Sequence, residues 1–310
     1  MVIKWGFQKG KQRYKCKNCG LLFTWSNKGV KDKNSWVWFT RWILERRTLK
    51  QLSQQSKLPR KALQKLFKKF LSSAPTISIV SKKSAHILID ATYFDGNRCL
   101  LIYRDNDLRF TQLFRFSDRE RYREIKEDLK NLNKLGVDIE SITCDGHRAM
   151  LKAIKEVYPK ANVQRCYVHV QRMVKAWLTQ HPRLPASKQL RFLCGLIHHI
   201  KSPIEQQMWT IAINSWYQQN QTIINEKVFN PYSGRWWYRH KKLRQSASMV
   251  IHALPDLFHH INNRSIPGTT NALESFFAHL KGHLNVHRGL SYKNKMNYIK
   301  WYLHLKNNQQ

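Results

Sequence analysis

Three carboxylates stand out in a chain that contains few acids. The 310 residues include 55 Lys and Arg against 19 Asp and Glu, which gives a formal net charge of +36. Asp90 interrupts the apolar stretch HILIDATYF, Asp145 ends the stretch ESITCD, and Glu274 lies within NALESFFAHLK. Because an ionised carboxylate taken out of water needs a compensating partner, a strand that buries Asp90 must place something beside it.

The pattern around Asp90 predicts a β-sheet with helices, an α/β fold. Three strands joined by tight turns are followed by helix, strand, helix and strand, which is the element order of the ribonuclease H-like fold. In that order the first and fourth strands are neighbours, so we expect Asp90 and Asp145 side by side. The predicted strands are 86–94, 98–104, 108–117, 140–145 and 162–166, with turns at Asp95-Gly96-Asn97 and Asp105-Asn106-Asp107.

Neighbouring carboxylates favour a metal site. Two that lie close repel each other, and one takes up a proton unless a cation holds both. Mg²⁺ prefers oxygen ligands, and a pair of such ions about 4 Å apart serves phosphoryl displacement. Two of the three acids also have ordinary explanations: Asp145 would cap the helix that follows it, and Glu274 would form a capping box with Asn271.

The excess of positive charge predicts a polyanionic partner, either nucleic acid or an anionic membrane surface. No apolar run approaches the roughly 18 residues that span a bilayer, and the first residues, MVIKWGFQKGKQRYK, lack the apolar core of a signal peptide. Hydrophobic residues make up 42% of the chain, which is enough for a folded core. These features favour a cytoplasmic protein that binds nucleic acid and no membrane.

The segment 1–28 resembles half of a zinc ribbon. Cys16 and Cys19 have the spacing of metal ligands, but tetrahedral Zn²⁺ needs four ligands and no second Cys-x-x-Cys exists. Either the first knuckle was lost upstream of Met1, or another group completes the site, or the segment is a β-hairpin without metal.

Residues 29–74 predict a helix-turn-helix. Thr48 followed by Gln51 is a capping-box pattern, and Pro59 suits the first turn of a helix. The last helix carries an apolar face and a basic face, so it would present positive charge to a DNA groove. The alternative is a helical hairpin whose basic face is only solvated. The basic residues are Arg60, Lys61, Lys65, Lys68 and Lys69.

The core is predicted to be interrupted. Residues 84–175 form its first part, an all-helical insertion occupies 176–262, and 263–310 supply closing helices. Within the insertion an aromatic and basic segment would stack on distorted DNA strand ends and neutralise their phosphates, unless its two Trp are core residues. Its members are Arg235, Trp236, Trp237, Arg239, Lys241, Lys242 and Arg244.

Four segments, in order, resemble the motifs of bacterial insertion-sequence transposases of the mutator-like group: LIDATYF, CDGHRAMLKAI, QRCYVHVQRMVK and TTNALESFFAHLK. That family has a ribonuclease H-like core with an Asp-Asp-Glu triad. The three acids are separated in the sequence by 145 − 90 = 55 and by 274 − 145 = 129, and the longer gap is where the family carries its helical insertion. The first Cys-x-x-Cys of the family's ribbon is missing here.

The resemblance implies that Asp90, Asp145 and Glu274 bind Mg²⁺ or Mn²⁺. It also matches Cys166 and His169 to a Cys-x-x-His that the group often carries, which here is a structural motif that either binds Zn²⁺ or only packs. The implied activity is that of a transposase, which cuts at the terminal inverted repeats and joins the 3′-hydroxyl to target DNA, as a homodimer or larger assembly. The rivals are a non-catalytic DNA-binding regulator and a ribonuclease H-like nuclease or resolvase.

Overall fold

A computed structural model describes residues 1–8, 10–24, 28–94 and 98–309 of the chain. The turn predicted at Asp95-Gly96-Asn97 lies outside these described residues. The chain forms two compact units: Met1–Pro75 with Leu280–Leu305, and Thr76–His279 with Lys306–Gln310. Much of the segment that we predicted to close the core, 263–310, therefore belongs to the same unit as the N-terminal helices.

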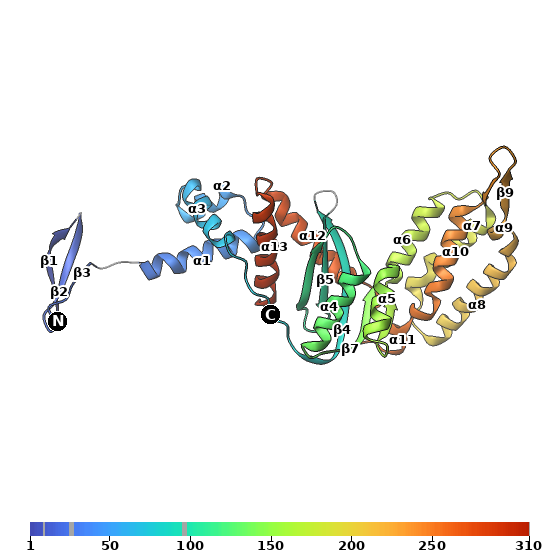
Figure 1. Cartoon of the computed structure of the whole chain (residues 1–310), viewed down its shortest axis with the longest axis horizontal. Coiled ribbons are helices and arrows are strands. Elements are labelled where there is room, and N and C mark those ends of the chain that lie inside the picture. Colours follow the sequence, from blue (N-terminus) through green and yellow to red (C-terminus); the bar gives the residue numbers. More distant parts are fainter. Residues whose placement is uncertain (9, 25–27, 95–97, 310) are drawn as a thin grey trace. The chain divides into compact units, whose positions relative to one another are not determined.

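The first unit contains a small antiparallel sheet and a helical group (Figure 1). The predicted capping box is confirmed at the start of α2, where Thr48 accepts from the Gln51 amide and the Gln51 side chain accepts from the Thr48 amide. Pro59 is the N-cap of α3. The elements are β1 (Val2–Gln8), β2 (Lys11–Cys16), β3 (Leu22–Thr24), α1 (Lys28–Leu44), α2 (Leu49–Ser56), α3 (Arg60–Leu71) and α13 (Tyr292–Asn307).

Aromatic packing joins α1 and α3 to α13. Trp42 stacks on Phe67 with ring centroids 4.6 Å apart, and both side chains are buried. Tyr298 donates its hydroxyl to the carbonyl of Ile43 at 3.0 Å, and Asn297 donates to the carbonyl of Leu71 at 2.7 Å. The last helix therefore contributes buried side chains to a core that it shares with helices near the other end of the chain, which no local pattern predicts.

The second unit is built on a mixed five-stranded sheet in the order β6-β5-β4-β7-β8. The first three strands in sequence pair antiparallel, and β4 pairs parallel with β7, as predicted for the first and fourth strands. The observed strands are β4 (Lys82–Phe94), β5 (Arg98–Asp105), β6 (Thr111–Ser117), β7 (Val137–Cys144) and β8 (Asn162–Arg165).

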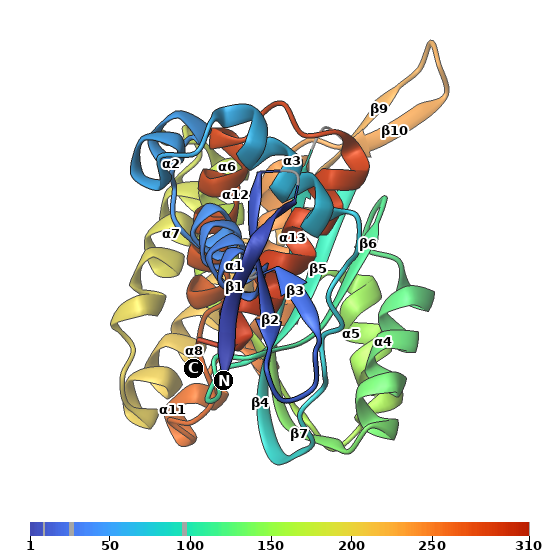
Figure 2. The same ribbon diagram turned by 90° about the vertical axis from the view of Figure 1, so that its left-hand side faces the viewer.

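Helices α4 (Tyr122–Lys134) and α5 (Arg148–Val157) cover one face of this sheet (Figure 2). Ala85, Ile87 and Ile89 of β4 share an apolar core cluster with these two helices. Because side chains alternate along a strand, Asp90 points to the opposite face. Leu88, on the same face as Asp90, is also fully buried, so both faces of β4 are covered.

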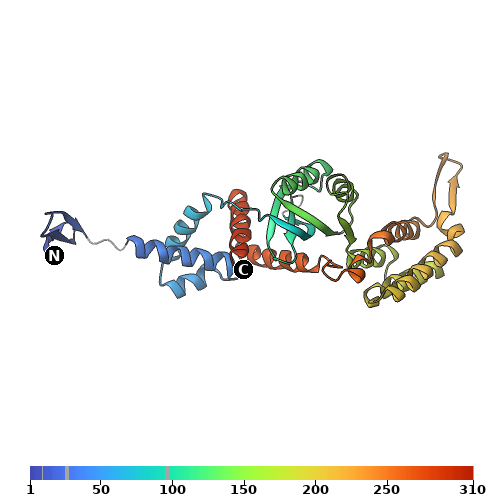
Figure 3. The same ribbon diagram turned by 90° about the horizontal axis from the view of Figure 1, so that it is seen from below.

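Helices α6, α7, α8 and α10 share a separate apolar cluster. These helices lie together in Figure 3. The predicted all-helical insertion is wrong in one respect, because a two-stranded antiparallel hairpin interrupts it. The bounds are α6 (Tyr167–Leu178), α7 (Pro185–Gly195), α8 (Pro203–Gln219), α9 (Gln221–Asn225), β9 (Lys227–Asn230), β10 (Arg235–Tyr238), α10 (Lys241–Ala253), α11 (His259–Asn262) and α12 (Asn271–Val286), with 3₁₀ turns at Leu196–His199 and Leu254–Asp256.

Candidate metal centre

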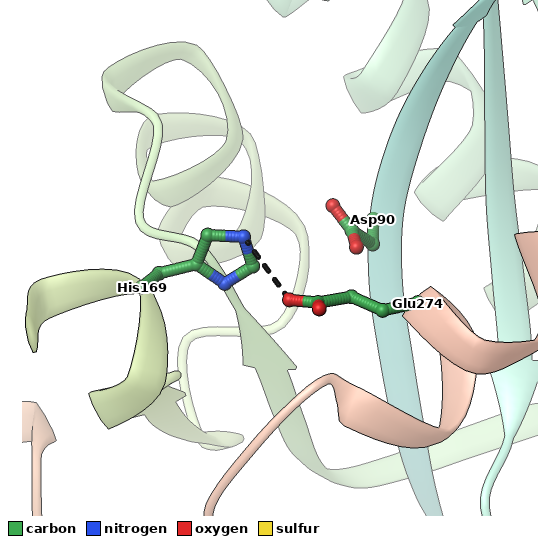
Figure 4. A group of neighbouring side chains, drawn as sticks. All are labelled: Asp90, His169 and Glu274. Atoms are coloured by element: carbon green, nitrogen blue, oxygen red, sulfur yellow. Dashed lines mark ion pairs between the residues drawn. The ribbon is translucent and has the colours of Figure 1, made fainter. Parts of the chain in front are cut away.

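Side chains from three elements meet beside the sheet (Figure 4). Asp90 comes from β4, His169 from α6 and Glu274 from the first turn of α12, and each offers a ligand atom within 4.8 Å of the others. Within the described part of the chain, this is the one group of three or more His, Cys, Asp or Glu side chains with such spacing. Two of the three predicted carboxylates are therefore together.

Asp90 is a buried charge among other acids. Its side chain accepts a hydrogen bond from the amide of Ala91 at 2.8 Å, and only 8% of the residue is exposed. The pKa of Asp90 is raised to about 7, mainly by burial and also by the charges of Asp145 and Glu274, while the Ala91 amide and His169 oppose the increase. A raised pKa means that burial disfavours the charged carboxylate, as the sequence argument for a compensating partner requires.

Asp145 lies next to this group without joining it. The parallel register pairs Ile87 with Ile142 and Leu88 with Thr143, and the same numerical offset carried to Asp90 reaches Asp145. Its carboxylate accepts from the amide of His147 at 2.8 Å. This bond closes the turn before α5 and does not cap the helix, because the N-cap of α5 is His147 and no side chain caps it, so the predicted capping role of Asp145 is wrong. The chain turns sharply here because Gly146 has φ +85°, and a Cβ there would collide with the Arg165 guanidinium.

Glu274 is held by two cationic side chains of α6. Arg172 donates from Nη1 to both carboxylate oxygens at 2.7 Å, and Nε2 of His169 lies 3.5 Å from Oε1. The carboxylate is thereby directed toward α6 and Asp90, as Figure 4 shows. Arg172 was not among the predicted site residues, although it lies three positions after His169 on the same helix.

Cys166 and His169 form a hydrogen-bonded pair at the start of α6. The bond with Cys166 raises the pKa of His169 to about 9, against the opposing effect of burial. Burial opposes ionisation of the Cys166 thiol, but its bonds with His169 and the Thr270 amide lower its pKa overall. Thr270 donates its amide to Sγ at 3.3 Å. A protonated imidazole donates hydrogen bonds and does not bind metal, so His169 in this state orients Glu274.

A fourth acid, Glu120, lies near Asp145. Burial raises the pKa of Glu120, and the charge of Asp145 adds to the increase. Glu120 occurs in the stretch SDRERYRE, where acids and bases alternate as they do on a solvated surface. Nothing in that pattern distinguishes it from its neighbours, so sequence reasoning missed it.

The predicted zinc residues lie at a β-turn. Cys16 is the last residue of β2. Its amide donates to the carbonyl of Leu21, and its carbonyl accepts from the amide of Gly20, so the turn between them contains Cys19. Among the described residues, no third Cys, His, Asp or Glu approaches the two thiols closely enough to share a metal ion. Zinc binding at Cys16 and Cys19 stays a prediction.

The basic residues predicted to contact DNA are exposed, except Arg244, which is half-buried and lies over the Tyr238 ring. On α3, Leu63 and Phe67 are buried, and the five predicted cations lie on the solvent-facing side. In the hairpin, Trp236 is 55% exposed and Trp237 is 47% exposed, so the alternative that both are core residues is wrong.

Taken together, buried acids beside a strand and basic surfaces define a class of site that suits a hard divalent cation and a polyanion. Residues 114–196 match the family model described as "Transposase, Mutator family". The resemblance noted in the sequence is thereby confirmed for this segment, which is a Mutator-family transposase region and contains Asp145, Cys166 and His169. Asp90 and Glu274 lie outside it.

No curated protein matches the chain. Among solved structures, a similar chain occurs in "CryoEM structure of simian T-cell lymphotropic virus intasome in complex with PP2A regulatory subunit B56 gamma". The identity is 14% and the TM-score 0.22, and the match covers 50% of this chain and 66%, just under two thirds, of that one. A similarity at this level carries no argument about fold or function. Among the described residues, no helix combines the length and apolar character needed to cross a bilayer.

Proposed function

We propose that the protein is a DNA transposase whose core is ribonuclease H-like and whose site residues are Asp90, Asp145 and Glu274. One observation carries this proposal: Asp90 and Glu274, which are widely separated in the sequence, come together on the face of the sheet opposite α4 and α5. Asp145 comes directly after β7, the strand that pairs with β4, and continuing the register of these two strands puts Asp145 opposite Asp90. The sheet order and the transposase match of residues 114–196 support it.

The side chains fit a divalent cation such as Mg²⁺ or Mn²⁺. Asp90 is buried with two other acids nearby, and no arginine or lysine forms a salt bridge with it among the described residues. Carboxylate oxygens are the ligands that these ions prefer. When bound, such an ion would polarise a phosphodiester and activate the attacking oxygen.

The protein's own contribution is to hold these acids in place and to bind the polyanion. Arg172 and His169 fix the rotamer of Glu274, and the Ala91 amide fixes Asp90. The basic face of α3 would bind the terminal inverted repeat, and the hairpin would contact strand ends. Because transposition joins paired ends, we expect a dimer or larger assembly on DNA.

The test is divalent-ion-dependent cleavage and strand transfer on DNA that carries the ends of the encoding element. Asp90→Asn, Asp145→Asn and Glu274→Gln should each abolish both steps, whereas Asp138→Asn, at an exposed position of β7, should leave them intact. Full activity in Asp90→Asn would refute the assignment. Cleavage without joining would favour the nuclease, and binding without cleavage by any variant would favour the regulator.

A further inference from the structure

A basic cavity lies at the end of α6, away from the acidic cluster. Its volume is about 480 Å³, and it is lined by the α6–α7 connection and by the junction of β10 with α10. Four of its lining residues are Arg183, Arg239, Lys241 and Lys242, and none of its described lining residues is acidic. Such a wall favours an anionic ligand.

The charge of this cavity is only partly neutralised. Glu226 pairs with Arg239 and His240. Among the described residues no salt bridge forms at Arg183, Lys241 or Lys242, although Lys242 also lies 5.9 Å from the centroid of the Trp177 ring. The first turn of α10, which begins at Lys241, contributes lining residues to the cavity, and the positive end of a helix dipole lies at such a turn. Phosphate oxygens match this combination of point charges and a helix dipole.

The hairpin beside the cavity offers aromatic surface. Cross-strand pairing of Trp236 with Phe229 puts both on one face, where they are 55% and 61% exposed. Lys227 and Tyr238 share this face, and the Lys227 ammonium lies 4.4 Å from the Trp236 ring centroid. Trp237 lies on the opposite face. Figure 2 shows the two strands extending beyond the helices of their unit. Exposed aromatic rings next to cations are typical of surfaces on which unpaired bases stack.

Helix α6 connects the cavity to the acidic cluster. His169 belongs to the cluster and Trp177 lines the cavity, and these residues lie eight positions apart on one helix. At about 1.5 Å per residue the separation along the helix axis is about 12 Å. The cavity and the carboxylates are therefore close enough for one DNA strand to reach both.

We propose that this cavity seats a backbone phosphate of an unpaired DNA strand while the hairpin stacks one or more bases of the same strand. The proposal rests on the proposed function, because it places this strand next to the site that would cut it. The site selects unpaired DNA, since a duplex hides the base faces that the hairpin requires.

Binding is measured by fluorescence anisotropy on full-length protein carrying Asp90→Asn, without divalent ions, so that the outcome does not depend on catalysis. The probes are a fluorescein-labelled single strand, a duplex with an unpaired tail, and a blunt duplex of the same sequence. The cavity variant is Arg183→Ala with Lys241→Ala. Its matched control, Lys130→Ala with Lys134→Ala, removes the same charge from α4.

We expect the cavity variant to bind the tailed probe at least tenfold more weakly, with a salt dependence shallower by about 0.7 for each phosphate that the protein no longer neutralises. The control pair should weaken binding by less than threefold. Trp236→Ala should weaken binding of the tailed probe about tenfold and change the blunt duplex little, whereas Phe192→Ala, another exposed aromatic, should change neither.

Equal losses of affinity in the cavity and control variants would overturn the proposal, as would equal affinity of the parent protein for tailed and blunt probes. Thermal melting of every variant verifies that it is folded. Failure of the binding test leaves the cleavage result for Asp90, Asp145 and Glu274 standing, and failure of cleavage leaves this binding result standing, so the two are separable.

Discussion

Replacing Asp90 with Asn should stabilise the protein in the absence of divalent ions. The folded pKa of Asp90 is about 7 against an ordinary value of 3.8, because burial and neighbouring acids disfavour its charge. A group whose pKa is raised by folding contributes its full stability below the unfolded value and loses it as pH rises through the folded value. The difference of about 3 pH units corresponds to about 4 kcal/mol at pH 8, and solvent relaxation reduces this to roughly 2–4 kcal/mol.

The assay is urea unfolding in EDTA from pH 4 to pH 8, with Asp138→Asn as an isosteric control at an exposed position of the same sheet. Asn retains the acceptor for the Ala91 amide, so the substitution removes little besides the charge. We expect the advantage of Asp90→Asn to be small near pH 4, to grow up to about pH 7 and then to level off. Equal stabilities of wild type and Asp90→Asn at pH 8 would refute the account of a carboxylate buried among acids.

Three further predictions concern the framework around the site. Arg115→Ala should destabilise the second unit by about 3 kcal/mol in urea unfolding, because Arg115 holds the buried Asp128 with hydrogen bonds of 2.6–2.9 Å; Arg115→Ala with Asp128→Ala should recover part of the loss, and no recovery would contradict the pairing. His287, whose pKa burial lowers to about 4, is neutral when folded but protonates below about 6.5 when unfolded. Acidification from pH 7.5 to pH 5 should therefore cost about 2 kcal/mol in wild type that His287→Phe does not lose, and parallel pH profiles would exclude this role. Phe67→Ala should cost about 3–5 kcal/mol, since Phe67 is 2% exposed and stacked on Trp42, whereas the exposed Lys68→Ala should cost under about 0.5 kcal/mol in the same unfolding assay.

Local sequence patterns predicted several elements and their pairing. The apolar run HILI indicated a buried strand at β4, and side-chain alternation puts Ile87 and Ile89 on the face covered by α4 and α5 and Asp90 on the other face. The parallel pairing of β4 with β7 followed from element order. The capping box at Thr48 followed from two residue types at fixed spacing. In each case a single physical constraint, burial or an unsatisfied backbone group, determines the residue pattern.

The pattern failed where no face is buried. Residues 227–238 form a hairpin that contacts solvent on both sides, so its strands show no alternation of apolar and polar residues. Its aromatic residues were therefore assigned to a helical region. The sequence also did not predict that residues 280–305 pack in the same unit as the N-terminal helices. An amphipathic pattern shows that a helix has an apolar face, but it does not show which partner covers that face.

At the candidate site, strand register predicts which residues are neighbours but not which side-chain atoms meet. The offset that pairs His86, Ile87 and Leu88 with β7, carried on to Asp90, leads to Asp145, but β7 ends at Cys144 and Asp145 belongs to the turn. The left-handed conformation of Gly146 and the bond from the His147 amide then set the direction of its carboxylate. His169 comes closer than Asp145 because α6 starts at Tyr167, with only Cys166 between it and the end of β8, and the first turn of α6 carries His169 to Asp90 and Glu274. Pairing predicts which backbones are adjacent, whereas the turn and the helix start decide which side-chain atoms meet, and those depend on interactions between residues far apart in the chain.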